Sequence, residues 1–444
     1  MSFMKASVQT GVVRTSLMVF GVAIGIIGAR WLGPAGVGVL ALLGLIKTLS
    51  YNFGNLGLGS AFAYHMAGKK ASARQLLTLV WWGSLGTSLL SGVVLLAIWR
   101  MNFSPWKDIQ AGLFFLALPL VPLVFLNNNL LRLLSGELRI GVLNIGDMLN
   151  AVTNLLFLVL LVVLLGMGVA GAVLALVIAD LLTVVYYLGA CRIGRREPEA
   201  PAEPIGALTL LYRLWQYGMW NHLLMFANAL GEELPLILLK NFTNSVSVGL
   251  FSRGRNLGQQ PRMVTMPIGF VLFPYTAASA PEDAARRTTV ACRNCLLIMA
   301  LTGGLVMLVA KPLISLLYGA AFLPAVPVVF VLMPGVVLWP VSYFLGIHIA
   351  AIGKPKAVFL TSLTTLVLGG VGCYLLIPRW GVIGAGLSTT LIYVIRSTTL
   401  LGLYRRVAHA SVVEVLLPRW SDRVYYQRLL QIPLALFSGK VKAV

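Results

Sequence analysis

The sequence predicts an all-α integral membrane protein of about twelve transmembrane helices, arranged as two parallel six-helix lobes around a central cavity. Three observations lead to this fold class. The 444 residues are 59% hydrophobic and only 11% charged, with a mean hydropathy of +0.90, whereas soluble proteins carry about 25% charged residues. Apolar runs long enough to cross a bilayer recur along the chain. The two halves of the sequence also resemble each other.

Windows of about 20 apolar residues predict the individual spans. The first lobe, residues 1–190, is predicted to contain helices over 13–30, 37–62, 76–98, 111–133, 141–164 and 170–190. A polar stretch over 191–213 is predicted to be a cytoplasmic linker. The second lobe, residues 214–404, is predicted to contain helices over 214–238, 246–274, 293–316, 322–350, 357–377 and 383–404. Residues 405–444 lack a long apolar run and are predicted to form a cytoplasmic tail that lies on the membrane interface.

The distribution of basic residues predicts the orientation of the chain in its membrane. Most of the 34 lysines and arginines fall in one alternate set of loops, and basic loops are retained in the cytoplasm. Both termini are therefore predicted to be cytoplasmic. Lys5 and Arg14 precede the first apolar stretch as in a signal peptide, but no A-x-A cleavage site follows, so this stretch is kept as a span. The net charge of +21 is explained by topology and attraction to anionic lipids rather than by nucleic-acid binding.

The internal repeat relates the two lobes. The segment WLGPAGVGVL, which contains Gly38, aligns with FTNSVSVGLF, which contains Gly249, and GVAGA from Gly168 aligns with GVIGA from Gly381. Because each unit contains an even number of predicted spans, both units enter and leave on the same side, so the repeats are parallel and are related by an axis along the membrane normal. The second and eighth predicted spans are equivalent in this repeat.

Motifs for catalysis and for metal binding are missing from the sequence. It contains no Walker, HExxH or GxSxG motif, and the single CxxC of Cys292 and Cys295 has no second half. We therefore predict no catalytic residue, no metal site, no disulfide and no bound cofactor. Without an ATP site, uphill transport would depend on a gradient or a partner, which leaves coupling to H⁺ or Na⁺ open.

Five cations fall inside predicted spans, where each costs about 3 kcal/mol unless it meets water or a partner. They are Lys47, Arg253, Arg255, Arg262 and Arg396. Helical spacing places Arg255, Gln259 and Arg262 on one face of the eighth span, with Asn256 on the adjoining stripe, and places Lys47, Tyr51 and Asn55 on one face of the second span. We expect these faces to meet in one cationic cavity that binds a phosphate or pyrophosphate, which would supply the missing counter-charge. Alternatively, these cations snorkel or pair with Glu232 and Glu233.

Four carboxylates also fall inside predicted spans: Asp147, Asp180, Glu232 and Glu233. Intramembrane carboxylates relay protons or bind Na⁺ in many transporters, and polar groups also bond neighbouring helices. The sequence leaves both roles open for these four. The run Asn127 to Asn129 is more typical of helix packing or a helix break than of ligand binding.

Several segments are similar to one known family. The stretches GARWLGPAGVGVLALLGLIKTLS, SVGLFSRGRNLGQQPRMVTMPIGFVLFP, LISLLYGAAFLPAVPVV and PRWGVIGAGLSTTLIYV together resemble the polysaccharide-transporter (Wzx-type flippase) branch of the multidrug/oligosaccharidyl-lipid/polysaccharide exporter superfamily, over roughly residues 1–405. The resemblance implies a two-lobed bundle that moves undecaprenyl-pyrophosphate-linked oligosaccharide, such as an O-antigen unit, from the inner to the outer leaflet by alternating access. It also implies that Lys47, Arg253 and Arg255 hold the pyrophosphate, and it suggests polymerase and chain-length proteins as partners.

Three alternatives remain. A drug exporter of the same superfamily shares the fold, but a cationic drug requires an anionic cavity, and the first, second and eighth spans contain no acidic residue. A lipid II flippase usually has two further spans, which the polar tail does not supply. A polysaccharide polymerase or ligase usually needs a large outer loop, and the predicted outer loops are short.

Overall fold

The computed structural model describes residues 3–67, 73–101, 105–192, 207–419 and 422. The predicted linker over 191–213 and the predicted tail therefore lie largely outside the described residues. The helices of the first half are α1 (Phe3–Gly54), α2 (Leu58–Ala67), α3 (Ala73–Arg100), α4 (Ala111–Ala117), α5 (Leu120–Gly136), α6 (Ile140–Leu158), the π-helix η1 (Val159–Leu164) and α7 (Gly168–Arg192). Those of the second half are α8 (Ala207–Phe242), α9 (Ser245–Gly258), α10 (Arg262–Ala278), α11 (Pro281–Tyr318), the 3₁₀-helix η2 (Ala320–Ala325), α12 (Val326–Ala351), α13 (Pro355–Ala408) and α14 (Val412–Leu416).

Two long helices each contain a bend at a glycine. Within α1 the backbone of Gly33 has φ 63° and ψ −179°, and within α13 that of Gly381 has φ 49° and ψ −121°. A residue with a side chain adopts such positive φ angles only with strain, so glycine marks the junction. Each bend separates two spans that hydropathy predicts as successive helices.

Among the described residues, nine helical segments are long and apolar enough to cross a membrane. Two of these nine contain the bends at Gly33 and Gly381, and the predicted eighth span corresponds to α9 and α10, which are joined through residues 259–261. The structure is therefore compatible with the predicted number of about twelve spans. It confirms a multi-pass, all-α membrane protein.

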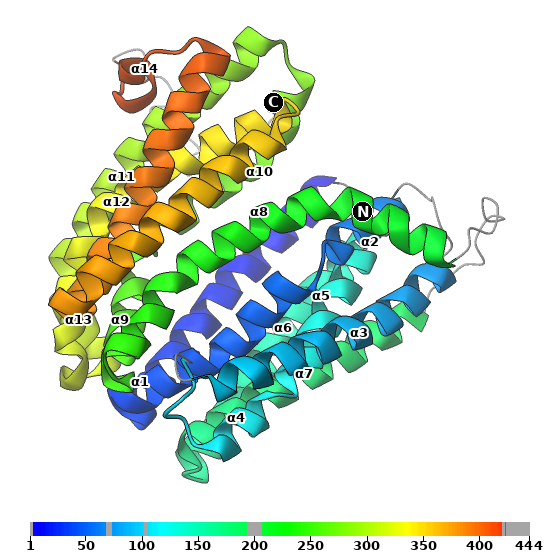
Figure 1. The fold of residues 1–444 in the computed structure, drawn as a ribbon, viewed down its shortest axis with the longest axis vertical. Coiled ribbons are helices and arrows are strands. Elements are labelled where there is room, and N and C mark those ends of the chain that lie inside the picture. The colour runs from blue at the N-terminus through cyan, green and yellow to red at the C-terminus, as the bar shows by residue number, and fades with distance from the viewer. Residues whose placement is uncertain (1–2, 68–72, 102–104, 193–206, 420–421, 423–444) are drawn as a thin grey trace.

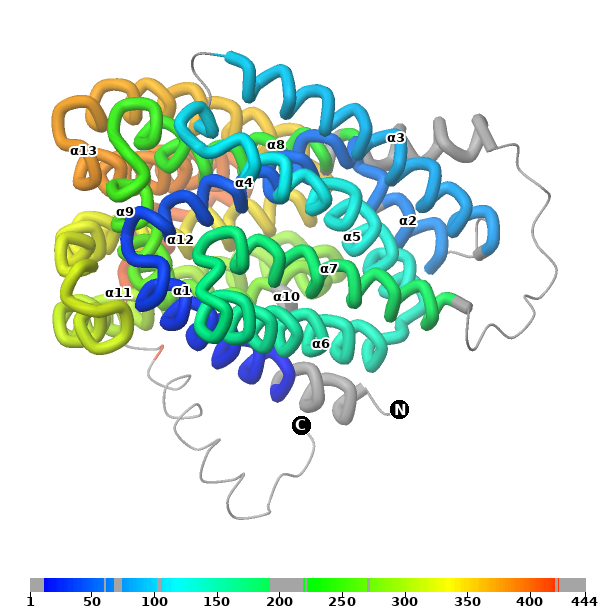
Figure 2. Tube along the Cα trace, turned by 90° about the horizontal axis from the view of Figure 1, so that it is seen from below, coloured from blue at the N-terminus to red at the C-terminus, as the bar shows by residue number. Residues whose placement is uncertain are grey.

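The helices form two bundles that diverge from a common end (Figure 1). Helices α1 to α7 pack together as the N-terminal lobe, through pairs such as α6 with α7 and α3 with α5. Helices α9 to α13 form the C-terminal lobe, and α8 packs both on α13 and on α1 and α2. Figure 2 shows the two bundles side by side from the perpendicular direction. The lobes are joined where α1 meets α9, and they separate toward the end that holds the N-terminus and α14 (Figure 1).

The two glycines that the repeat aligns pack against each other where the lobes meet. A Cβ atom on Gly38 of α1 would lie 1.7 Å from the carbonyl oxygen of Ser245, and one on Gly249 of α9 would lie 2.0 Å from that of Pro34. Each such Cβ would also lie 3.0 Å from the other glycine's amide nitrogen. The contact is reciprocal, because each glycine faces the residue four positions before the other. This is the pattern expected of equivalent helices that cross on a two-fold axis.

The last described residues are tied to the C-terminal lobe by a buried ion pair. Ser411 and Glu414 form a capping box at the start of α14. Beyond this helix, Arg293 of α11 donates a 2.5 Å hydrogen bond to Asp422, and both side chains are buried. Burial raises the pKa of Asp422, but the hydrogen bonds from Arg293 and from the backbone amide of Arg419 outweigh it and hold the pKa below its usual range.

This ion pair predicts that the contact with Asp422 is lost in acid. Because the pKa of Asp422 is lower when folded, its charge stabilises the contact above the unfolded pKa of about 3.9, and this stabilisation disappears as the pH falls through the folded pKa. Hydrogen exchange of residues 409–419, corrected for the intrinsic rate, should rise below that pH. The Asp422→Asn variant should exchange as fast at pH 7 as the wild type does in acid. Equal protection in the two proteins at pH 7 would contradict this assignment.

Candidate functional site

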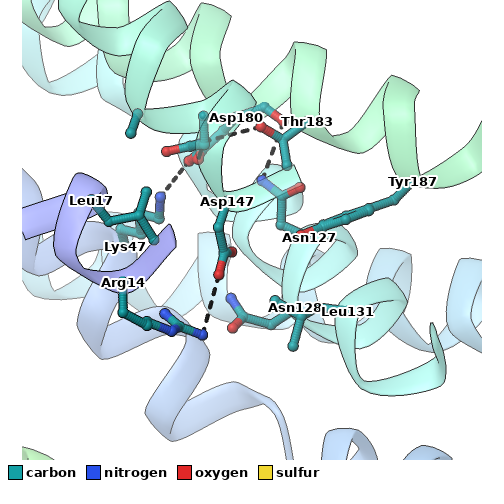
Figure 3. A pocket seen from close by; sticks show the side chains of 12 residues that line it. Arg14, Leu17, Lys47, Asn127, Asn128, Leu131, Asp147, Asp180, Thr183 and Tyr187 are labelled. Carbon is teal, nitrogen blue, oxygen red and sulfur yellow. Dashed lines mark hydrogen bonds and ion pairs between the residues drawn. The ribbon is translucent and has the colours of Figure 1, made fainter. Parts of the chain in front are cut away.

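A polar cavity of about 310 Å³ lies inside the N-terminal lobe (Figure 3). The ammonium group of Lys47 in α1 donates a 2.6 Å hydrogen bond to the carboxylate of Asp180 in α7. Asn150 of α6 donates to the other oxygen of Asp180 at 3.0 Å. Nearby, the guanidinium of Arg14 lies 3.3 Å from the carboxylate of Asp147. The cavity therefore holds two cations and two carboxylates, and each cation has a carboxylate partner.

Helical spacing explains why these side chains share the cavity. Asp180, Thr183 and Tyr187 follow one another at three- and four-residue intervals and line the cavity from α7. Asp147 and Asn150 are three residues apart on α6 and lie opposite. The Lys47–Asp180 pair is unequal in exposure, with 34% of the lysine side chain accessible and 3% of the aspartate. The lysine thus faces the open part of the cavity while the carboxylate behind it is buried.

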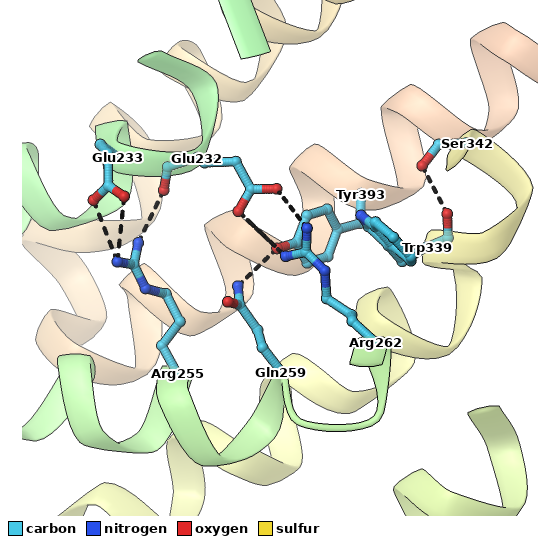
Figure 4. A network of polar contacts seen from close by, with 8 residues as sticks. All are labelled: Glu232, Glu233, Arg255, Gln259, Arg262, Trp339, Ser342 and Tyr393. Atoms are coloured by element: carbon cyan, nitrogen blue, oxygen red, sulfur yellow. Dashed lines mark hydrogen bonds and ion pairs between the residues drawn. The ribbon is translucent and has the colours of Figure 1, made fainter. Parts of the chain in front are cut away.

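A second charged network crosses the C-terminal lobe (Figure 4). Arg255 of α9 lies 3.2 Å from the carboxylate of Glu233 and donates to the backbone oxygen of Glu232 at 3.0 Å. Arg262 of α10 lies 3.3 Å from the carboxylate of Glu232. The hydroxyl of Tyr393 in α13 donates to Glu232 at 3.1 Å. Two adjacent glutamates on α8 therefore hold two arginines from two different helices.

The remaining contacts of this network fix the arginines further. The same hydroxyl of Tyr393 accepts hydrogen bonds from Gln259 at 2.8 Å and from Arg262 at 2.9 Å. The guanidinium of Arg262 also stacks over Trp339, with its carbon 4.4 Å from the ring centroid, in a cation–π contact that strengthens when it is desolvated. Arg396 of α13 adds a third cation beside Glu232, and its Nε is buried without a hydrogen-bond partner among the described residues. The network has one cation more than it has carboxylates.

Arg253 lies where the lobes meet. Its guanidinium nitrogens are 3.2 Å and 3.4 Å from the positions that Cβ atoms would occupy on Gly25 and Gly28 of α1. Its guanidinium carbon is 5.4 Å from the ring centroid of Tyr318. Within the described part of the chain, no carboxylate lies within ion-pair distance of Arg253, and its buried Nε has no hydrogen-bond partner. This arginine therefore carries an uncompensated charge between the two lobes.

Tyr51 and Asn55 lie in a third location. With Asn52, they line a cavity of about 230 Å³ between the lobes, together with Arg132 of α5 and two residues of α8, His222 and Met225. Tyr51 is hydrogen-bonded to Arg132. A Cβ atom on Gly59 would lie 2.8 Å from the Tyr51 hydroxyl and 3.1 Å from the Asn55 amide nitrogen, so the absence of a side chain at Gly59 makes room for both.

A family model described as "Polysaccharide biosynthesis protein" matches residues 27–327, which is more than half of the chain. The chain belongs to the polysaccharide biosynthesis protein family. A search of curated proteins finds no match to it.

Solved structures show which fold this member of the polysaccharide biosynthesis family has. The lipid II flippase MurJ, in an inward closed conformation, is similar with a TM-score of 0.73 at 12% identity, covering 99% of this chain and 94% of that chain. An inward-facing MATE-family multidrug resistance transporter of the MOP superfamily is similar with a TM-score of 0.70 at 15% identity, covering 90% and 98%. An outward-facing MATE structure gives a TM-score of 0.63 at 16% identity, covering 91% and 96%. The family match and the shared fold confirm the resemblance to the polysaccharide branch of this superfamily.

The charged groups of this polysaccharide biosynthesis protein differ from the predicted ones in one respect. The expectation that the protein lacks counter-charges is wrong, because Lys47, Arg255 and Arg262 each have a carboxylate within 3.3 Å. The alternative pairing with Glu232 and Glu233 is confirmed for the two arginines. Instead of lying in one shared pocket, the predicted residues are distributed over two lobe networks, the seam at Arg253 and the smaller cavity at Tyr51. Asn256 is exposed on α9.

Several residues of these networks are not predicted from the sequence. Arg14 is counted there as a loop cation, although it lies within α1, where its guanidinium reaches Asp147. Trp339 and Tyr393 are aromatic residues within predicted spans, where an aromatic residue by itself carries no functional signal. Asn127 and Asn128 line the N-terminal cavity, whereas the buried Asn129 donates to Ser84, which is the predicted packing role.

Contacts between the lobes of the family member also gather near the Gly33 bend. Arg30 donates to the backbone oxygens of Leu316 and Leu317 at 2.5 Å and 3.2 Å. Lys240 at the end of α8 pairs with Asp108 in the α3–α4 connection, and its hydrogen bond and positive charge lower the pKa of Asp108. Together with the Gly38–Gly249 contact, these interactions hold the lobes together at one end.

Proposed function

We propose that this protein is a flippase that moves polyprenyl-pyrophosphate-linked oligosaccharide, carried on undecaprenyl in a bacterial inner membrane, from the inner to the outer leaflet for surface polysaccharide assembly. The observation that carries the proposal is the match to a polysaccharide biosynthesis family on a chain with a transporter fold. A membrane protein of this fold contributes to polysaccharide synthesis most directly by moving a lipid-linked intermediate across the bilayer.

The excess positive charge in the membrane supports an anionic substrate. Arg253 lies between the lobes without a carboxylate partner, and a guanidinium binds phosphate oxygens with paired, charge-assisted hydrogen bonds. In the proposed cycle Arg253 captures the pyrophosphate first. Arg255 then exchanges Glu233 for the substrate, and Lys47 of the other lobe can exchange Asp180 in the same way. The lipid tail stays in the bilayer and the glycan occupies the polar space between the lobes.

The arrangement of the lobes supports an inward-facing state in this cycle. The predicted topology assigns the end with the N-terminus and α14 to the cytoplasm, which is the end where the lobes diverge (Figure 1). The contacts of Arg30, Lys240 and Gly38 then lie at the outer side and close it. The structure would correspond to an inward-facing state, and transport would proceed by breaking these contacts as the lobes rock.

Ion coupling is assigned to the carboxylates in the same proposal. Protonation of Asp180 would break its ion pair and release Lys47, and binding of Na⁺ near Asp147 would compete with Arg14. Glu232 and Glu233 would respond in the same way to substrate that binds their arginines. In the same proposal the lobes span residues 1–190 and 214–404, the basic loops contact anionic lipids, and a polymerase or chain-length protein is the partner.

Depletion of the protein in its source cell tests the proposed function. Lipid-linked oligosaccharide should accumulate as complete repeat units that face the cytoplasm, because synthesis continues while translocation stops. The measurement is extraction of the lipid together with its accessibility to an impermeant probe on each side. Accumulation of unpolymerised units on the outer leaflet would instead indicate a polymerase, and no accumulation would contradict a role in glycan translocation.

A further inference from the structure

The smaller cavity at Tyr51 contains a buried hydrogen-bond acceptor without a partner. Only 8% of Asn55 is exposed, and its Oδ1 has no hydrogen-bond donor among the described residues. An unsatisfied buried acceptor costs about 1–3 kcal/mol. Asn55 also lines the cavity, so rotation of its side-chain amide toward a bound ligand that donates a hydrogen bond would recover this energy.

The other lining residues indicate a ligand rich in hydroxyl groups. Asn52, Arg132 and His222 supply hydrogen-bonding groups, and Met225 supplies an apolar surface. Tyr51 supplies an aromatic ring to the lining, and the ring of Phe226 lies 6.5 Å from that of His222. Ligand sites combine a few placed polar groups with apolar and aromatic walls in this way. A sugar ring presents both hydroxyl donors and apolar C–H faces.

A sugar fits this cavity better than a phosphate does. An ionised phosphate offers only acceptors, so it leaves the Oδ1 of Asn55 unsatisfied, whereas a sugar hydroxyl can donate to it. Among the lining residues that the structure describes, Arg132 alone carries a formal charge, and its side chain is already hydrogen-bonded to Tyr51. The cavity volume of about 230 Å³ lies below the 300–1,000 Å³ or so of sites for drug-sized ligands, and this suits a single sugar ring.

We propose that Asn55, Arg132 and His222 form a glycan subsite that binds one sugar residue of the lipid-linked substrate, apart from the arginines that bind the pyrophosphate. This inference rests on the proposed function. The subsite is contributed by the N-terminal lobe and by α8, because Asn55 and Arg132 belong to the N-terminal lobe and His222 belongs to α8, which packs on both lobes. Sugar binding would therefore link the N-terminal lobe to α8 at the proposed cytoplasmic end.

The experiment compares two lipids on the purified full-length protein: the lipid-linked glycan extracted from depleted cells and bare undecaprenyl pyrophosphate. The wild type should bind the glycan-bearing lipid more tightly. Asn55→Ala should weaken that binding about tenfold, which corresponds to one hydrogen bond of about 1.4 kcal/mol, and should leave binding of the bare lipid unchanged. Asn55→Asp, which keeps an acceptor, should retain part of the preference. The Arg255→Ala/Glu233→Ala double variant, which leaves no unpaired carboxylate, should weaken binding of both lipids.

Thermal unfolding separates this role from a structural one. Since the Oδ1 of Asn55 has no partner among the described residues, Asn55→Ala should be at least as stable as the wild type. Equal affinity of the wild type for both lipids, or equal weakening of both in Asn55→Ala, would overturn the subsite and leave the flippase proposal intact. Binding of neither lipid by the wild type would contradict the flippase proposal, and the subsite with it.

Discussion

Arg255→Ala is expected to abolish transport and to destabilise the C-terminal lobe by about 3 kcal/mol. Two effects combine in this variant. The guanidinium assigned to the pyrophosphate is lost, and Glu233, of which only 18% is exposed, is left as a charge without its partner at 3.2 Å. Removing one member of a buried ion pair typically costs about 3–5 kcal/mol. A single substitution therefore cannot separate binding from folding.

The Arg255→Ala/Glu233→Ala double variant separates the two effects. Removing both charges eliminates the unpaired carboxylate, so thermal stability should return to near the wild-type value. Transport of lipid-linked glycan into the outer leaflet of reconstituted vesicles should remain lost, because no guanidinium is restored. Recovery of transport in the double variant would show that Arg255 serves only to neutralise Glu233.

Arg255→Lys measures how much of the effect depends on geometry. A lysine retains the charge but cannot form the paired hydrogen bonds of a guanidinium. Partial transport in Arg255→Lys would indicate that charge dominates, and complete loss would indicate that the bidentate geometry is required. Transport at the wild-type rate in both Arg255→Lys and Arg255→Ala would overturn the assignment of Arg255 to the substrate.

Hydropathy predicts the helices well because the apolar length of a span is a property of the local sequence, and the repeat identifies which spans are equivalent. The bends at Gly33 and Gly381 separate helices that hydropathy divides at the same places. The alignment of Gly38 with Gly249 identifies two residues that the structure brings into contact.

The pairing of the charges could not be predicted, because it depends on how each helix is rotated against its neighbours. Lys47 and Asp180 are 133 positions apart, and a polar stripe on each helix does not determine which stripe it will face. Glu232 and Glu233 are successive residues, which point about 100° apart on a helix. Each glutamate nevertheless has an arginine as its ion-pair partner, because α9 and α10 bring arginines to α8 from different directions.

Gly38→Ala is expected to open the contact between α1 and α9. The new Cβ would lie 1.7 Å from the carbonyl oxygen of Ser245, and a backbone atom cannot rotate away as a side chain can. The helices must therefore move apart, and overpacking of this kind typically costs about 1–3 kcal/mol. Gly44→Ala on the same helix is the matched control, because its Cβ would meet no atom within 4 Å. Alanine there should be neutral, or stabilising by up to about 1 kcal/mol.

Spin labels can be attached to cysteines that replace Arg100 and Arg379, which are exposed on opposite lobes. The distance between the labels would measure the separation of the two lobes directly. Gly38→Ala should shift the distances to longer values and lower the melting temperature, whereas Gly44→Ala should change neither. Wild-type distances and stability in Gly38→Ala would show that the crossing is not closely packed. Gly249→Ala should reproduce the effect, since its Cβ would lie 2.0 Å from the oxygen of Pro34.

Gly38→Ala and Gly249→Ala combined should lower the stability by less than the sum of their separate effects. The first substitution already separates the backbones that the second would push apart. That non-additivity distinguishes one shared contact from two independent packing defects.

The Gly38–Gly249 contact also bears on transport. A transporter that rocks about an axis between its repeats requires a contact that tolerates a change of angle, and two glycines whose backbones touch provide a crossing without interlocked side chains. If Gly38 and Gly249 form this pivot, either alanine should reduce transport by favouring the separated lobes, even where the arginines proposed to bind the substrate are intact.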